Sequence, residues 1–417
     1  MINESEFSGE RRRIANLSLA VLVCVNVMSQ LDRQIMSVLV ESIRVDLALT
    51  DQQIGNLVGI AFGVFYVLAG LPLGRLADRT NRRNVIVAVL SFWSLATAAC
   101  GFARGYWELF LARVGVGIGE AGCAPAAQSI LSEIFPKERI GRALATYQVA
   151  ISIGILVGLV GGGWLADQFH WRTVFMIVGF PGLAMALIVR FVLKEPERTE
   201  GEVLEPVSVV LKTLMSMKTI RHHMLACSIH TMTLAATATF NFAFMLRVHN
   251  MTNTEAGLTI GLITGLAGGF GTYMGGYLGD RLAQRDPRWR IGCLAVGAVA
   301  SIPFTVGAYL SNSLPLTVIG LTIGVIGSYM YAGAAHAVAQ SLVSQRMRAM
   351  TAASMLFAMN LFGYAVGPSV AGAISDLFGG GEALRYALAV MNGLLLWAAL
   401  HYFLAMRTYR EDLARVA

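Results

Sequence analysis

Twelve long apolar segments run through this chain of 417 residues and constrain its fold more than any other feature. They lie at about 14–40, 52–77, 84–103, 105–134, 142–166, 172–193, 222–248, 255–279, 291–310, 314–341, 350–376 and 383–406. A helix needs ~20 residues to cross a hydrocarbon layer of ~30 Å. Uninterrupted hydrophobicity, rather than alternation, favours helices over a barrel. We therefore predict an all-α membrane protein with twelve transmembrane helices.

The composition excludes the main soluble classes. Charged residues make up 14% of the chain, whereas a soluble domain carries about 25%. The five cysteines lie within apolar segments and form no CxxC pair, so the sequence indicates neither a disulfide framework nor a metal site. HExxH, GxSxG and Ser/His/Asp patterns are also missing, so we expect no enzyme and no cofactor.

The basic residues alternate between the two sides of the predicted membrane. Twenty-five of the 32 Lys and Arg fall in the termini and alternate loops on one side, and five fall on the other. This asymmetry predicts cytoplasmic N- and C-termini. It also explains the net charge of +7 without a nucleic-acid partner. Because the protein is compact, we expect a multi-pass protein of a plasma membrane, specifically a bacterial inner membrane.

The two halves of the chain are internal repeats. An offset of 202 aligns Thr50 with Thr252 and Gln53 with Glu255, which predicts capping boxes at two helix starts. An offset of 209 aligns Asp167 with Asp376. We therefore predict a six-helix bundle at 1–193, a cytoplasmic central loop at 194–221 and a second six-helix bundle at 222–417. The loop is either a flexible linker or, in its later part, an amphipathic helix on the membrane face. Two parallel six-helix repeats are typical of transporters.

The motif GRLADRTNRR, which begins at Gly74, resembles the signature loop of the major facilitator superfamily. GYLGDR, which begins at Gly276, is its weaker copy. The resemblance implies a conformational latch made of Gly74, Asp78, Arg79, Arg82, Gly276, Asp280 and Arg281. The alternative is a basic cytoplasmic loop that only obeys the charge rule for topology.

A second glycine pattern has a different explanation. Gly117, Gly119 and Gly122 match the GxGxxG fingerprint of dinucleotide-binding proteins, but that fingerprint acts only between a strand and a helix. Here it lies within an apolar segment. We therefore predict close helix packing through small residues.

Four charged residues lie away from the ends of predicted spans, where such residues are costly and mark functional sites. Asp32 and Arg33 are adjacent in the first span, and Arg113 and Glu120 are seven residues apart, hence on one face of the fourth. A carboxylate beside permanent cations can gain and lose a proton as its surroundings change. We predict that Asp32, Glu120 and Arg33 couple proton binding to conformation. A static ion-pair network is the alternative.

These charges and their neighbours resemble the Spinster branch of the superfamily. The resemblance rests on Asn26, Asp32 and Arg33, on GRLADRTNRR, and on Arg113 followed by GVGIGEA. It implies a proton-coupled carrier of lysolipids or sphingolipids, such as sphingosine-1-phosphate, driven by the proton gradient. A related branch of organic-anion symporters also carries Arg and Glu in the fourth span.

The predicted cargo and partners follow from this reading. The substrate is an amphipathic lipid or, alternatively, a small organic anion or drug, and a non-transporting membrane receptor is a third possibility. The predicted substrate-binding residues are Arg33, Arg113, Asn241, Tyr329 and Asn360. We expect the bilayer and protons as the other partners, and a protein that functions as a monomer.

Overall fold

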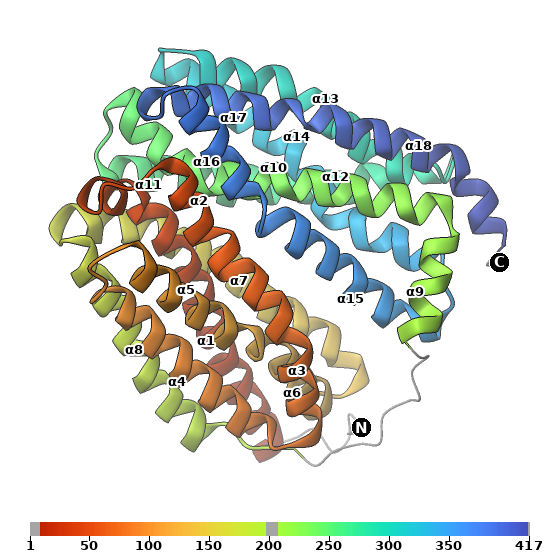
Figure 1. Ribbon diagram of the computed structural model, residues 1–417. Helices are drawn as coiled ribbons and strands as arrows, with labels where there is room; N and C mark the ends of the chain where they lie inside the picture. The colour runs from red at the N-terminus through yellow and green to blue at the C-terminus, as the bar shows by residue number, and fades with distance from the viewer. Residues whose placement is uncertain (1–8, 197–206, 416–417) are drawn as a thin grey trace. The chain divides into compact units, whose positions relative to one another are not determined.

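The structure, a computed structural model, describes residues 9–196 and 207–415. Over these residues the chain is helical, and no strand occurs among them. This agrees with the predicted all-α class. Figure 1 shows the helices and their labels.

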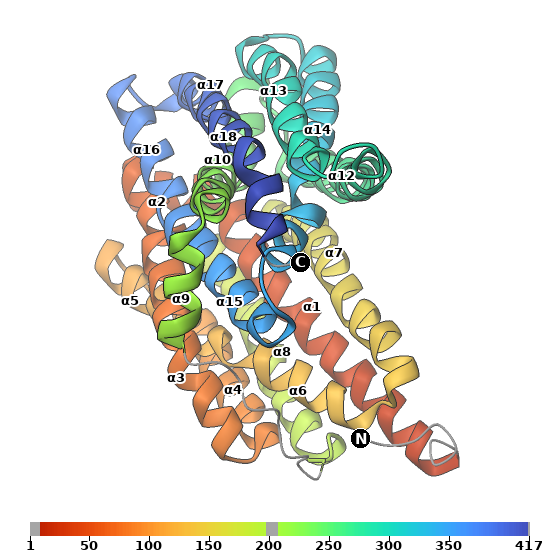
Figure 2. The ribbon, with the colours of Figure 1, turned by 90° about the vertical axis from the view of Figure 1, so that its right-hand side faces the viewer.

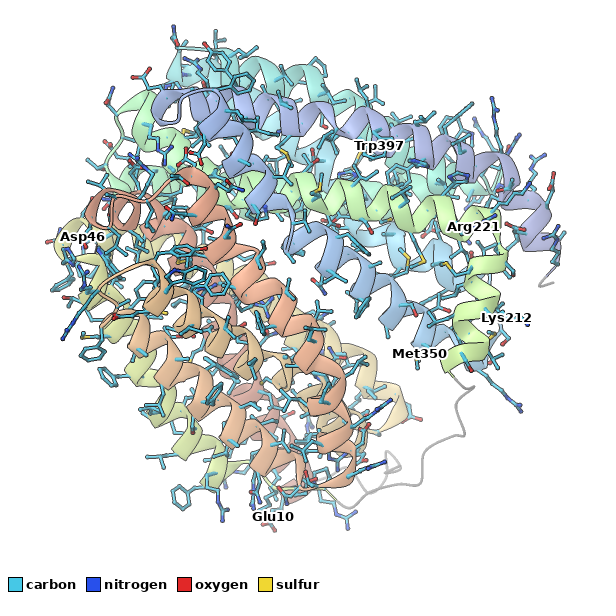
Figure 3. The ribbon with its side chains drawn as sticks, in the orientation of Figure 1. Glu10, Asp46, Lys212, Arg221, Met350 and Trp397 are labelled. Carbon is cyan, nitrogen blue, oxygen red and sulfur yellow. The ribbon has the colours of Figure 1, made fainter. Side chains whose placement is uncertain are left out.

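The first half of the chain forms the six predicted spans, two of which are divided into shorter helices. Its helices are α1 (Gly9–Asp46), α2 (Asp51–Val58), α3 (Phe65–Arg79), α4 (Arg82–Cys100), α5 (Tyr106–Ala121), α6 (Cys123–Ile134), α7 (Lys137–Gln168) and α8 (Trp171–Val192). A π-helical turn, η2 (Ile60–Val64), joins α2 to α3. In Figure 3, Glu10 and Asp46 lie at opposite ends of this bundle, because α1 runs along its whole length.

The second half repeats this plan after a short extra helix. Its helices are α9 (Val207–Ser216), α10 (Lys218–His249), α11 (Asn253–Leu262), α12 (Gly268–Ala283), α13 (Trp289–Leu310), α14 (Leu314–Ser341), α15 (Arg348–Ala358), α16 (Gly367–Leu377), α17 (Leu384–Gly393) and α18 (Leu395–Ala414). Further π-helical turns, η3 (Ile263–Ala267) and η5 (Met359–Tyr364), lie before α12 and α16. The turn η3 begins 203 residues after η2, one residue more than the repeat offset of 202. Figure 2 shows α13 and α14 packed against each other.

Eleven helical stretches in the described residues are long and apolar enough to cross a membrane. The remaining predicted span, 255–279, is helical from Asn253 to Ala283 but is rich in glycine, which lowers its hydropathy. A count of twelve spans therefore fits the helices, although one of them is weakly apolar.

The central loop is partly helical. Residues 197–206 of the predicted 194–221 loop lie outside the described residues. The helix α9 buries Val210 and Leu214, one turn apart, within the core of the second half, and it packs against α10 and α15. In Figure 3, Lys212 on α9 lies at the same end of this bundle as Met350 on α15. The next helix begins at Lys218, four residues before the predicted position.

The described residues divide into two compact units that differ slightly from the two sequence halves. The first unit contains the chain up to Leu49, the stretch from Ile60 into the central loop, and Thr252–Gly261. The second contains Thr50–Gly59 and the rest of the second half. Each half therefore contributes one short helix, α2 or α11, to the opposite unit.

Both predicted capping boxes are present at the starts of these exchanged helices. The Thr50 hydroxyl accepts a hydrogen bond from the backbone amide of Gln53, and the Gln53 side chain accepts one from the backbone amide of Thr50. Thr252 and Glu255 repeat the arrangement at the start of α11. Each pair satisfies two amides that have no partner within the helix.

The break in the fourth predicted span has a local cause. Pro125 lacks the amide that would bond to the Ala121 carbonyl, so the helix is interrupted between α5 and α6 at Gly122. Glu120 is therefore in the last turn of α5. The predicted packing role of the glycines is confirmed, because a Cβ added to Gly119 would lie 2.6 Å from the Cβ of Trp93.

Candidate functional site

Arg33 and Glu120, two of the predicted proton-coupling residues, form an ion pair within the first unit. Arg33 on α1 donates from Nε to Glu120 Oε2 at 2.7 Å. The Ser29 hydroxyl, one turn before Arg33, donates to the same oxygen at 3.0 Å. The Glu120 side chain is fully buried, whereas 30% of the Arg33 side chain is exposed. The arginine thus holds a buried carboxylate and keeps one accessible edge.

The second carboxylate oxygen of Glu120 lacks a partner. Oε1 is buried and accepts no hydrogen bond from the described residues. Such an oxygen loses its water without a replacement, which costs free energy. Oε1 is therefore the oxygen of Glu120 that is available to bind a proton or to accept a hydrogen bond from a ligand.

Asp32 is directed differently from its neighbour Arg33. Its side chain is buried, and the Thr97 hydroxyl on α4 donates to Asp32 Oδ2 at 3.4 Å. Asp32 also lies within electrostatic range of Glu120 and Arg113. Adjacent helical residues point ~100° apart, so α1 presents the two charges in different directions.

Arg113 completes the group, and it lies over the same aromatic ring as Arg33. Its guanidinium carbon lies 5.1 Å from the centre of the Phe62 ring, and that of Arg33 lies 5.0 Å from the same centre. Arg33 also lies 4.8 Å from the Tyr66 ring. Asp32, Arg33, Arg113 and Glu120 thus form one cluster, which we call the charged centre.

The sequence analysis did not identify Ser29, Phe62 or Tyr66. Ser29 precedes Arg33 by four residues, and Phe62 precedes Tyr66 by four, so each pair lies on one helix face. That spacing was the available signal. Apolar segments contain many such pairs, which is why the pattern alone did not distinguish these residues.

The predicted polar residues of the second half have separate surroundings. Asn241 on α10 accepts a hydrogen bond from the Tyr309 hydroxyl on α13 at 2.8 Å. The ring of half-buried Tyr329 packs over Gly268, where an added Cβ would lie 3.1 Å from it. Asn360 is half-buried in the π-helical turn η5. Their role in substrate binding stays a prediction.

Two buried histidines of α10 tie this helix to α14. His230 Nε2 donates to the Ser328 carbonyl at 2.9 Å, and His223 Nε2 donates to the Ala335 carbonyl at 2.8 Å. A carbonyl only accepts, so Nε2 carries the hydrogen in each ring. The His230 ring also stacks on Tyr331. Both histidine rings therefore link α10 to α14.

The predicted latch residues differ in burial. Arg82 is buried and forms ion pairs with Glu133 on α6, at 2.6 Å, and with Glu195, at 2.9 Å. Asp78 and Arg79 are exposed at the end of α3.

In the second copy of the loop, exposed Asp280 lies 3.8 Å from Arg290, and Arg281 donates to the Tyr277 hydroxyl. Both glycines, Gly74 and Gly276, have open space where a Cβ would lie. A latch role for these residues stays a prediction.

A second buried ion pair lies in the second unit. Asp51 at the start of α2 accepts from both terminal nitrogens of Arg247, at 2.8 and 2.9 Å, and from the Ser375 hydroxyl. Asp376 accepts the amides of Asp51 and Gln52. Asp167, its repeat partner, accepts the amides that open α11. The aspartates paired by the offset of 209 therefore cap the two exchanged helices.

No group of three His, Cys, Asp or Glu suited to a metal ion occurs in the described part of the chain. The five cysteines are free thiols.

The chain is similar in sequence to known membrane transporters. The sequence profile of the Major Facilitator Superfamily matches residues 22–361 and 225–416. An "MFS-type efflux pump" of Mycolicibacterium smegmatis is 32% identical over 98% of this chain and 96% of its own length. "Protein spinster homolog 1" of Xenopus tropicalis is 30% identical over 43% of this chain and 34% of that protein.

Solved structures give the same fold. A bacterial homolog of the human lysosomal transporter Spinster, in an inward-facing and unoccupied conformation, matches with a TM-score of 0.88 at 28% identity. The match covers 96% of this chain and 98% of that one. The nucleoside transporter NupG matches with a TM-score of 0.75 at 16% identity, which supports the fold alone.

Proposed function

The chain belongs to the major facilitator superfamily, and from this premise we propose that it is a proton-coupled secondary transporter working by alternating access. The family and the fold indicate a multi-pass membrane transporter of Spinster-like structure rather than an enzyme. We place the protein in a bacterial inner membrane with both termini cytoplasmic. Its partners are the bilayer, protons and one substrate, it acts as a monomer, and the proton gradient replaces any cofactor.

The Glu120 carboxylate is the observation that carries the proton-coupling proposal. Its Oε2 is held by Arg33 and Ser29, while its buried Oε1 has no hydrogen-bond partner among the described residues. Protonation of Glu120 would weaken the ion pair and free the Arg33 guanidinium for another anion. Asp32 shares the electrostatic surroundings of Glu120 and Arg113, so the two carboxylates respond to each other's charge.

We propose an amphipathic anionic lipid as cargo, of the lysolipid or sphingolipid class. Arg33 and Arg113 supply two cations for an anionic head group, and the accessible edge of Arg33 gives it a point of contact. The likeness to the bacterial Spinster homolog supports this class. A small organic anion or drug is the second candidate, favoured by the full-length similarity to an MFS-type efflux pump.

Transport by the purified full chain in proteoliposomes tests both cargo classes. Labelled lysophospholipid, sphingosine-1-phosphate and a sugar acid are offered with and without a pH gradient. Gradient-driven movement of the lipids alone supports the lipid proposal, whereas movement of the sugar acid alone supports the second candidate. Failure of the gradient to accelerate any probe overturns proton coupling.

A conformational assay tests proton coupling without a known cargo. Spin labels at Arg104→Cys and Asn312→Cys, one in each unit, report a distance at acid and neutral pH in a cysteine-free background. We expect Glu120→Gln and Asp32→Asn to reduce the pH response, and Glu138→Gln, the same change at an exposed carboxylate, to keep it. An unchanged response in both single variants and the double variant would defeat the assignment.

A further inference from the structure

The aromatic residue Phe62 occupies an unusual place in the charged centre. Its ring lies about equally far from the guanidinium carbons of Arg33 and Arg113, at 5.0 and 5.1 Å. Tyr66, one turn later, stacks on Phe62 with ring centres 5.5 Å apart and also faces Arg33. The face of an aromatic ring carries negative potential, so one ring stabilises two cations that would otherwise repel each other.

The π-helical turn η2 gives Phe62 this position. A π-helical turn holds one more residue than an α-helical turn, and such turns are frequent at functional sites. Conversion of η2 to regular α-helix shifts the register by one residue, which turns a side chain by ~100° about the helix axis. The Phe62 ring therefore contacts both arginines only while the π-helical turn persists.

Close packing against α5 holds the turn in place. A Cβ added to Gly117 would lie 2.5 Å from the Phe62 carbonyl oxygen, so the backbone of η2 touches α5 directly. Gly117 lies between Arg113 and Glu120 on the same helix. The helix α5 thus contacts the π-helical turn and also carries two members of the charged centre.

The boundary between the compact units lies beside the same turn. Residues Thr50–Gly59 group with the second unit, and the chain from Ile60 groups with the first. The helix α2 is fixed within its unit by the buried pair of Asp51 with Arg247 and by contact of Gly55 with the Pro368 backbone. The chain thus passes from one unit to the other directly before η2, so a relative movement of the units would strain this turn.

We propose that Phe62 is a positioning residue that couples movement of the two units to the charged centre. Its ring attracts both Arg33 and Arg113 and keeps Arg33 on Glu120 while η2 is π-helical. Relaxation of η2 withdraws the ring, brings the two cations into stronger repulsion and loosens Arg33 from Glu120. This inference rests on the proposed function, because it describes how the proton site of that function is regulated.

Substitution of Phe62 tests the proposal with the spin-label pair defined above. Phe62→Leu removes the ring and keeps an apolar side chain, while Phe62→Tyr keeps the ring. We expect Phe62→Leu to displace the pH midpoint of the distance change by about half a unit or more. We expect Phe62→Tyr to restore the wild-type midpoint. If Phe62 had only a structural role, its substitution would change the stability of the protein, but the pH midpoint would not depend on whether the ring is present.

Matched variants separate this inference from the proposed function. Phe110→Leu makes the same change on α5, where the ring contacts Tyr106 and Trp107, and we expect it to leave the midpoint unchanged. Thermal unfolding in detergent verifies that each variant folds. If Phe62→Leu keeps the wild-type midpoint while Glu120→Gln abolishes the response, the Phe62 proposal fails and proton coupling stands. If Glu120→Gln keeps the full response, the proposed function fails whatever Phe62→Leu does.

Discussion

Single charged side chains decide most of the chemistry of this protein. The buried Glu120 accepts hydrogen bonds from Arg33 and Ser29 at Oε2, and within the part of the chain that the structure describes its Oε1 accepts none. An ionisable group in a transmembrane helix is costly and persists where it serves a function. Under the proposed function, the charged centre is the part of the molecule where a one-proton change would act.

We expect Glu120→Gln to lower gradient-driven uptake by about tenfold or more, because the coupling between proton and substrate is lost. Exchange of labelled substrate without a gradient should be less affected, since the amide keeps the shape of the side chain. Initial rates in proteoliposomes measure both. Equal losses in the two assays would show a folding or binding defect rather than loss of coupling.

A second residue-scale prediction concerns Arg82. Removal of this guanidinium in Arg82→Ala leaves Glu133 and Glu195 without their buried partner, and we expect a loss of about 3 kcal/mol in the free energy of unfolding. Arg79→Ala, an exposed change in the same motif, should alter it by about 0.5 kcal/mol or less. Denaturation in detergent provides the comparison. Equal effects would mean that Arg82 is not the buried anchor of the loop.

At the scale of elements, the repeat is visible in how helix starts are capped. Asp376 accepts the first amides of α2, and Asp167 accepts the first amides of α11. Negative charge at a helix N-terminus is favourable, and these amides have no partner within the helix. Corresponding aspartates thus stabilise corresponding helices.

We expect Asp376→Ala to increase amide exchange at the start of α2, and Asp167→Ala to increase it at the start of α11. Each change removes a cap worth about 1 kcal/mol. Hydrogen exchange followed by mass spectrometry resolves the two segments, and each variant is the control for the other. If either variant alone increased amide exchange at the start of both helices, the assignment of one cap to each helix would be wrong.

At the scale of the whole molecule, the asymmetry of Lys and Arg predicts the orientation of the chain in the membrane. Twenty-five basic residues lie on the side assigned to the cytoplasm. Loops between spans therefore alternate between the two sides. The loop at Gln284 should face the cytoplasm and the loop at Asn312 the outside.

Labelling of introduced cysteines checks this orientation. In a cysteine-free background, a membrane-impermeant maleimide should label Asn312→Cys in intact cells and Gln284→Cys only after the membrane is opened. Reaction of both positions with a permeant maleimide is the control. The reverse pattern would invert the assigned topology.

The sequence alone predicted the helical class, the boundaries of most spans, the repeat and the four members of the charged centre. These features follow from local rules, since apolar length sets a span and a charge within it stands out. The capping boxes at Thr50 and Thr252 are equally local, because their partners lie three residues away.

Only the tertiary structure decided which groups meet. Three contacts join residues far apart in the chain. They are the pairing of Arg33 with Glu120, the contact of the Phe62 ring with two arginines and the capping of α2 by Asp376. The exchange of α2 and α11 between the units was likewise not visible in the sequence. An apolar helix can pack with any face, so its partners are set by the shapes of the neighbouring helices and not by its own periodicity.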